Sequence, residues 1–295
     1  MLAARLISTV ILIPLLVLLV RTDQHFGSSA PLFLLLCLGI AGRGAWELRQ
    51  LAAGRISTPP AQLTISLSCL VVLAAWLPVL SDLVPRTLPA QLAGIGAALI
   101  ASVILLLTVE AVRFRTAGSS IESLGSGLLT VLYCGGLTAT TALLRWIPNE
   151  ETGFFALLSL IVCVKAGDTT AYCFGRLWGR RQMAPYLSPG KTWMGLAGAV
   201  CGSCAGTVLW FHYATAAFVP TAAPPGILNV IAFGVVLGLT GLLGDLCESL
   251  LKRDCGKKDT AALMPGFGGL LDLVDSPIFT GPVALLWWLV IPPVH

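Results

Sequence analysis

Long apolar segments alternate with short polar segments along the whole chain. Nine of these apolar segments approach the ~20 residues that a helix needs to cross the hydrocarbon core of a bilayer. They lie at about 5–20, 31–48, 62–80, 89–110, 127–146, 153–175, 193–213, 227–250 and 276–293. Because lipid offers no partners to backbone N–H and C=O groups, we expect helices and not the alternating strands of a membrane barrel. The pattern predicts an all-α, polytopic integral membrane protein of about nine transmembrane helices.

Composition supports this class. Hydrophobic residues make up 56% of the chain, charged residues only 11%, and the mean hydropathy is +0.89. Soluble domains carry about 25% charged residues, so a soluble protein is excluded and no nucleic-acid partner is expected. Most of the nine cysteines lie within apolar segments. We expect even the C-x-x-C of Cys201 and Cys204 to be small packing residues and not a metal or redox site.

The distribution of Lys and Arg predicts the orientation in the membrane. Fourteen of these residues fall before the first span or in the even-numbered connections, three fall in the odd-numbered ones, and Lys165 lies inside a span. By the positive-inside rule, the N-terminus and the even-numbered connections are cytoplasmic. We expect the first apolar segment to be a retained helix and not a cleaved signal, because eight more spans follow.

We expect a single membrane-embedded domain, 1–295, in which the two halves differ in chemistry. Residues 1–150 hold few polar groups within their spans, and Trp46, Glu47 and Arg49 at the end of the second span are typical of an interfacial anchor. Residues 151–295 hold most of the candidate chemistry. We therefore expect this half to be catalytic.

Charged residues enter the sixth span, where they are costly and usually functional. Lys165 and Asp168 are three residues apart and share a helix face, which Tyr172 continues. This face lines a site or forms a structural ion pair.

The polar stretch 175–195 follows the sixth span; it is basic and is interrupted by prolines and glycines before Lys191 and Thr192. Glycine-rich backbone beside basic side chains suits phosphate oxygens, or equally an anionic lipid headgroup.

The segment from Gly244 to Ser276 holds six of the fourteen acidic residues and four of the eighteen basic residues. Four of its polar residues share one helical face by their spacing, namely Asp245, Glu248, Ser249 and Lys252. A loop rich in glycine follows, and then Asp272 and Asp275 lie three residues apart before the last span. Carboxylates beside permissive backbone are ligands that Mg²⁺ accepts, although a solvated, salt-bridged loop is the alternative. Together with the phosphate-binding candidates, they indicate phosphoryl or nucleotidyl transfer at the cytoplasmic surface.

Three motifs resemble those of the phosphatidate cytidylyltransferases, also called CDP-diacylglycerol synthases. They are S-x-x-K-R-x4-K-D-x5-P-G-x-G-G-x2-D-x2-D from Ser249 to Asp275, D-x3-Y-x2-G-R-x2-G-R from Asp168 to Arg180, and S-P-G-K-T-W from Ser188 to Trp193. The resemblance is strong over about 160–285. It implies Mg²⁺-dependent transfer of CMP from CTP to phosphatidic acid in the bilayer, which yields CDP-diacylglycerol and pyrophosphate.

The resemblance also assigns roles to residues. The implied catalytic residues are Asp245, Lys252, Asp259, Asp272 and Asp275, of which the four aspartates are the metal ligands. The implied substrate-binding residues are Asp168, Tyr172, Ser188, Lys191, Thr192, Ser249, Arg253 and Lys258. A bacterial inner membrane with the site facing the cytoplasm is the implied location. A second cation and a homodimer are left open.

The chain departs from the family pattern at three positions. Phe267 replaces the family His of P-G-H-G-G, Leu273 replaces the Arg of D-R-x-D, and Met194 stands where Glu or Gln is common. Either these family residues are dispensable, or the acceptor is another lipid phosphate, or activity is lost. The retained carboxylates and lysines favour an active enzyme. A transporter with an ion site at Lys165, Asp168 and Asp245 is an alternative of another class. A structural scaffold would leave the acidic cluster unexplained.

Overall fold

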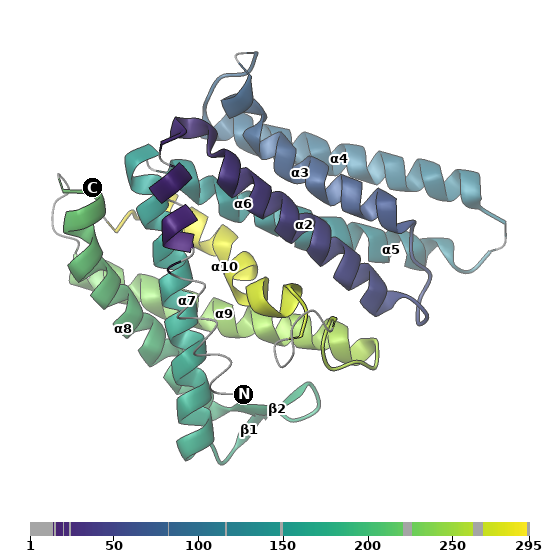
Figure 1. Cartoon of the computed structure of the whole chain (residues 1–295). Coiled ribbons are helices and arrows are strands. Elements are labelled where there is room, and N and C mark those ends of the chain that lie inside the picture. The colour runs from purple at the N-terminus through teal and green to yellow at the C-terminus, as the bar shows by residue number, and fades with distance from the viewer. Residues whose placement is uncertain are drawn as a thin grey trace. The chain divides into compact units, whose positions relative to one another are not determined.

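The computed structural model describes residues 14–293, apart from 15, 20, 24, 82, 116, 148–149, 221–225 and 262–267. Eight helical segments in this part of the chain are long and apolar enough to cross a membrane, which confirms the polytopic all-α class (Figure 1). They correspond to the second to ninth predicted spans, whereas most of the first predicted span, 5–20, lies outside the described residues.

The elements follow the predicted order, with one hairpin of two short strands between the sixth and seventh spans (Figure 1). They are η1 (Gly27–Ser29), α2 (Pro31–Ala52), α3 (Ala61–Leu80), α4 (Leu88–Arg113), α5 (Ser120–Thr130), the π-helical η2 (Val131–Gly136), α6 (Leu137–Ala142), η3 (Leu143–Trp146), α7 (Glu150–Trp178), β1 (Gln182–Ala184), β2 (Ser188–Thr192), α8 (Trp193–Phe218), α9 (Ile227–Asp254) and α10 (Leu271–Val290). One span comprises α5 to η3.

The described chain forms two compact units. The N-terminal unit comprises Arg21–Leu143 together with Asp254–Leu273, so it includes the connection between α9 and α10. The C-terminal unit comprises Met1–Val20, Leu144–Arg253 and Val274–His295, as far as these are described. The boundary therefore falls within the first turn of α10, between Leu273 and Val274.

Helices of the N-terminal unit pack closely around a buried tryptophan. Trp76 of α3 is fully buried, lies 5.7 Å from the ring of Phe33 in α2, and donates from Nε1 to the carbonyl of Ser29. The buried Asp23 accepts hydrogen bonds from the backbone N–H groups of Leu32 and Phe33, and so satisfies donors at the start of α2. A helix start capped by a carboxylate outside the helix recurs at α10.

Glycines let α7 and α8 approach in the C-terminal unit. Gly198, Gly202 and Gly206 repeat every four residues along one face of α8, the small-residue spacing of close helix pairs in membranes. A Cβ at Gly202 would lie 2.7 Å from the carbonyl oxygen of Ala166 in α7. The hydroxyl of Thr170 in α7 lies 2.7 Å from the carbonyl oxygens of both Ala166 in its own helix and Gly198 in α8, so these two acceptors share its single proton.

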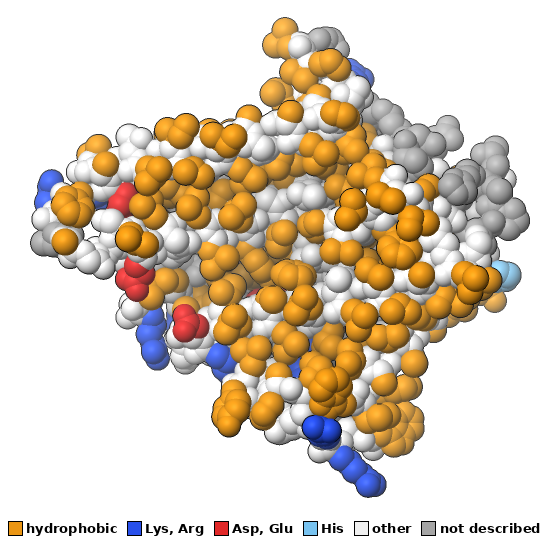
Figure 2. Space-filling model, turned by 180° about the vertical axis from the view of Figure 1, so that it is seen from behind, with side chains coloured by type: hydrophobic (Ala, Val, Ile, Leu, Met, Phe, Trp, Pro, Cys, Tyr) orange, Lys and Arg blue, Asp and Glu red, His pale blue; other side chains and the backbone are white. Residues whose placement is uncertain are grey.

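Hydrophobic side chains cover most of the face seen in Figure 2. On α4, for example, Ile100 and Ile104 are more than half exposed. Apolar surface of this extent is typical of a lipid-facing protein.

Candidate active site in the C-terminal unit

A cavity of about 240 Å³ lies among α7, β2, α8 and α9 in the C-terminal unit. Its walls contain six of the side chains predicted from the sequence, namely Asp168, Tyr172, Ser188, Lys191, Thr192 and Asp245. Glycines and small residues form much of the remaining lining, including Gly167, Gly195, Gly238 and Gly241. Segments distant in sequence thus bring polar groups of both charges around one hollow.

Helix α7 places Asp168 and Tyr172 one turn apart on the cavity wall. Asp168 pairs with Lys165, whose Nζ lies 3.6 Å from Oδ2, and both side chains are only partly exposed. Tyr172 accepts a hydrogen bond from Arg176 through its hydroxyl oxygen. The face predicted from the spacing of these residues therefore lines a cavity, and Lys165 and Asp168 form the predicted ion pair as well.

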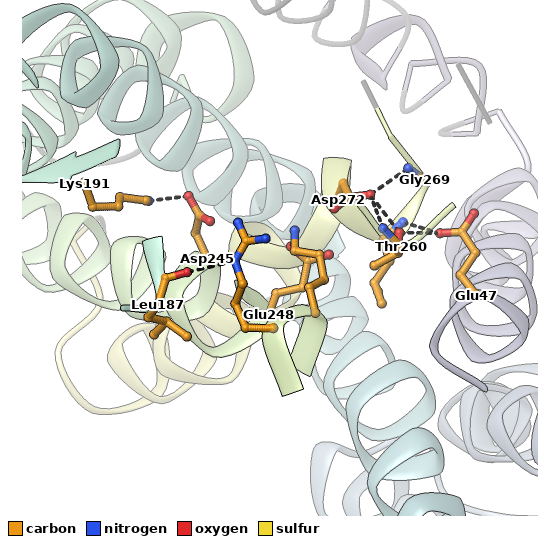
Figure 3. Close-up of polar contacts among 11 residues, drawn as sticks. Glu47, Leu187, Lys191, Asp245, Glu248, Thr260, Gly269 and Asp272 are labelled. Carbon is orange, nitrogen blue, oxygen red and sulfur yellow. Dashed lines mark hydrogen bonds and ion pairs between the residues drawn. The ribbon is translucent and has the colours of Figure 1, made fainter. Parts of the chain in front are cut away.

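The hairpin of β1 and β2 supplies the basic side of the cavity. Its strands pair antiparallel, with Gln182 opposite Thr192. Thr192 ends β2 and caps α8, because its Oγ1 accepts a hydrogen bond from the backbone N–H of Gly195. Lys191, one residue earlier, forms an ion pair with Asp245 of α9 (Figure 3). Prolines and glycines in this stretch predicted an interruption of helix but not the strands themselves.

Three carboxylates converge beside this ion pair. Asp245 and Glu248, one turn apart on α9, and Asp275 of α10 each present an oxygen within 4.8 Å of the others. Glu248 and Asp275 are buried, whereas Asp245 is partly exposed and also lines the cavity. Lys252 donates to Glu248 over 2.7 Å, and so brings a second ammonium group to the cluster.

This donor set fits a divalent cation. Like charges held this close repel, and a hard cation that prefers carboxylate oxygens would relieve the repulsion. Asp245 and Asp275 were predicted as ligands, whereas Glu248 was placed on the correct helix face but given no role. Its spacing of three residues from Asp245 was the signal that could have identified it.

The other predicted residues lie at varied positions. Ser249 and Lys252 are buried on α9, while the exposed Arg253 donates from Nε to the carbonyl of Leu187 in the hairpin loop (Figure 3). Lys258 and Asp259 are exposed in the connection after α9.

Asp272, at the start of α10, belongs to the N-terminal unit and bonds to groups of that unit. The proposed metal roles of Asp259 and Asp272 stay predictions, and Phe267 lies outside the described residues.

Several known proteins are similar in sequence to this chain. The chain is 34% identical over 167 residues to a phosphatidate cytidylyltransferase of Chlamydia trachomatis, covering 55% of this chain and 54% of that protein. It is 38% identical over 124 residues to a phosphatidate cytidylyltransferase of Haemophilus influenzae, covering 42% of each. The uncharacterized protein YnbB of Escherichia coli is 38% identical over 135 residues, covering 46% of this chain and 43% of that protein. The chain thus spans about half the length of these relatives.

The match to a protein family covers more of the chain than the matches to single relatives. The model of the cytidylyltransferase family matches residues 3–290, which include every helix that forms the cavity and the acidic cluster. With this match, the chain belongs to the cytidylyltransferase family.

Proposed function

We propose that this protein transfers CMP from CTP to phosphatidic acid and releases pyrophosphate. The observation that carries the proposal is the position of Asp245, which lines the cavity, pairs with Lys191 and belongs to the acidic cluster. A bound cation and anionic phosphates would lie next to each other at this position. The choice of acceptor and nucleotide is supported by the relatives that are named phosphatidate cytidylyltransferase.

The reaction needs no nucleophile from the protein. An oxygen of the lipid phosphate attacks the α-phosphorus of CTP, the bond from that phosphorus to the bridging oxygen breaks, and its electron pair leaves with pyrophosphate. Lys191 would contact the phosphates from β2, and Lys252 would do so from α9. Asp245 would hold Lys191 in place through their ion pair. Catalysis then consists of positioning and of balancing charge.

The acidic cluster would hold Mg²⁺ through Asp245, Glu248 and Asp275. A bound ion there would neutralise phosphate charge and orient the reacting groups. The buried pair of Glu248 and Lys252 would fix the rotamer of the glutamate, because each side chain restricts the other. Asp275 would be oriented by the helical backbone of α10.

The bilayer determines where the acceptor meets the nucleotide. We expect the protein in a bacterial inner membrane with this site toward the cytoplasm, because Lys and Arg concentrate in the connections on that side. The basic stretch 175–195, which contains the hairpin of β1 and β2, would lie at the same surface, where CTP is available and where phosphatidic acid presents its headgroup.

Pyrophosphate release by the purified protein in mixed micelles tests the proposal. Release with Mg²⁺ should require both CTP and phosphatidic acid, should fail with ATP, and should fall at least tenfold in Asp275→Asn. A parallel reaction with polyprenyl phosphate tests the alternative that the acceptor is another lipid phosphate. Release only with polyprenyl phosphate would refute phosphatidic acid as the substrate. No release with either lipid would refute the nucleotidyl transfer itself.

A further inference from the structure

Glu47 is a buried carboxylate in the half of the chain that the sequence predicted to hold little chemistry. It lies near the end of α2 and is 0% exposed. The sequence favoured an interfacial anchor for this residue, and that interpretation is wrong for Glu47, because an anchor would reach the membrane surface. Burial of a carboxylate is costly unless hydrogen bonds satisfy its oxygens. The partners of Glu47 therefore indicate what it does.

Both carboxylate oxygens of Glu47 accept hydrogen bonds from the beginning of α10. Oε1 accepts from the backbone N–H of Leu270 over 3.0 Å, and Oε2 accepts from the backbone N–H of Leu271 over 2.9 Å. Oε1 also accepts from Arg43 over 2.8 Å. The first N–H groups of a helix have no partner inside the helix, and a negative charge there complements the helix dipole. Glu47 thus caps α10 from a helix more than 200 residues earlier in the chain.

A second carboxylate completes this network (Figure 3). Oδ2 of Asp272 accepts from the backbone N–H groups of Thr260 and Gly269, over 3.0 and 2.7 Å. The hydroxyl of Thr260 lies 2.7 Å from Asp272 and 3.3 Å from Glu47, so its single proton favours Asp272. Gly269 has no room for a side chain, because a Cβ there would overlap Thr260 and Glu47. All of these residues belong to the N-terminal unit.

The helix that Glu47 caps also carries Asp275. Because α10 is continuous from Leu271 to Val290, Asp275 lies one helical turn after the N–H group of Leu271 that Glu47 caps. Outer contacts that orient a ligand are typically worth 10–100-fold in metal affinity or activity. We propose that Glu47 is a positioning residue, which fixes the first turn of α10 and thereby the carboxylate of Asp275 for cation binding. This inference rests on the metal site of the proposed function.

Glu47→Gln tests the inference, with Glu122→Gln as its matched control. Glutamine keeps the shape of the side chain but replaces one acceptor oxygen with an NH₂ group that faces N–H donors. Glu122 lies in the same unit and also accepts a backbone hydrogen bond, but it is exposed and its donor, Ser57, lies outside α10. The measurements are hydrogen exchange of a peptide covering 268–275, Mn²⁺ binding by electron paramagnetic resonance, and steady-state kinetics with CTP.

We expect Glu47→Gln to accelerate hydrogen exchange in 268–275 and to weaken Mn²⁺ binding about tenfold or more. The kcat should change by a larger factor than the KM for CTP. Glu122→Gln should match the wild type in all three measurements. Wild-type exchange in Glu47→Gln would overturn the inference. Faster exchange with unchanged Mn²⁺ affinity would also overturn it, because Glu47 would then stabilise the helix without positioning Asp275.

A milder variant covers the case in which Glu47→Gln does not fold. Thr260→Val keeps the shape of the side chain and removes only the hydroxyl between Glu47 and Asp272, so it should produce the same changes at smaller amplitude. Unchanged exchange and Mn²⁺ affinity in that variant would count against the network. Exchange and Mn²⁺ binding require neither CTP nor lipid. A wild-type protein inactive with phosphatidic acid would therefore refute the proposed function without affecting these readouts.

Discussion

The ion pair of Glu248 and Lys252 offers a way to separate stability from chemistry. The two side chains are 1% and 11% exposed, and Lys252 Nζ lies 2.7 Å from Glu248 Oε2. We consider Glu248→Met, Lys252→Met and the double variant, because methionine has a similar length and no charge. Each single change leaves one buried charge without the partner it has in the native protein. The double change leaves neither charge.

The expected magnitudes differ between the variants. Loss of one partner from a buried pair costs about 3–5 kcal/mol, and we expect about 3 kcal/mol because Lys252 keeps some exposure at the end of α9. At roughly 2–4 °C per kcal/mol, each single variant should melt about 6–12 °C below the wild type. Replacement of a whole buried pair by apolar side chains is often neutral, so the double variant should recover to within about 1 kcal/mol.

Activity should follow a different order from stability. Glu248→Met removes one of three clustered carboxylates, so turnover should fall at least tenfold and require more Mg²⁺. The double variant should stay inactive although it is stable. The assays are heat-induced loss of the monodisperse peak in detergent, and pyrophosphate release across a Mg²⁺ titration. A double variant as unstable as the sum of the singles would refute the ion-pair argument. One that turns over at the wild-type rate would refute the metal role of Glu248.

Two further predictions concern packing and orientation. Gly202→Ala should destabilise the protein by about 1–3 kcal/mol in the same melting assay, because the added methyl group would contact the carbonyl of Ala166. Gly96→Ala is the control: there is open space around its Cβ, so this variant should be neutral or slightly stabilising. Cys255, just outside α9, should react with a membrane-impermeant maleimide in inverted vesicles but not in intact cells, and labelling from outside the cell would refute the predicted orientation. Burial, reinforced by Asp254, raises the pKa of this thiol, so the labelling rate should keep rising above the pH range usual for cysteine.

The sequence predicted the helices and part of the site because both depend on local patterns. Length and hydropathy alone identify spans, and a spacing of three or four residues puts side chains on one face of a helix. The faces of Asp168 with Tyr172 and of Asp245 with Glu248 were predicted in this way, and the structure confirms both. The resemblance to family motifs assigns the residues of both faces to the same reaction.

Pairings between distant segments could not be predicted by the same means. Near the end of a span, a Trp-Glu-x-Arg stretch has the same local pattern whether it anchors at an interface or caps another helix. Only the tertiary partners distinguish the two, and for Glu47 these include the backbone N–H groups of Leu270 and Leu271 at the beginning of α10. The strands of the hairpin were missed for a related reason, since proline and glycine report where a helix stops but not what replaces it.

The two aspartates at the start of α10 show how one short motif can serve two purposes. Asp272 and Asp275 are three residues apart on one helix, yet Oδ2 of Asp272 is engaged by the backbone and side chain of Thr260 and by Gly269, whereas Asp275 joins the acidic cluster of the C-terminal unit. A substitution that moves the first turn would therefore disturb both carboxylates, while a change at Asp275 alone would leave the network of Glu47 intact. The two carboxylates of the motif D-x2-D thus have different surroundings, and the metal roles predicted for both stay predictions. The position between them, Leu273, belongs to the anchored turn, and its backbone N–H bonds to the carbonyl of Leu270, so the turn forms without the arginine of the family pattern.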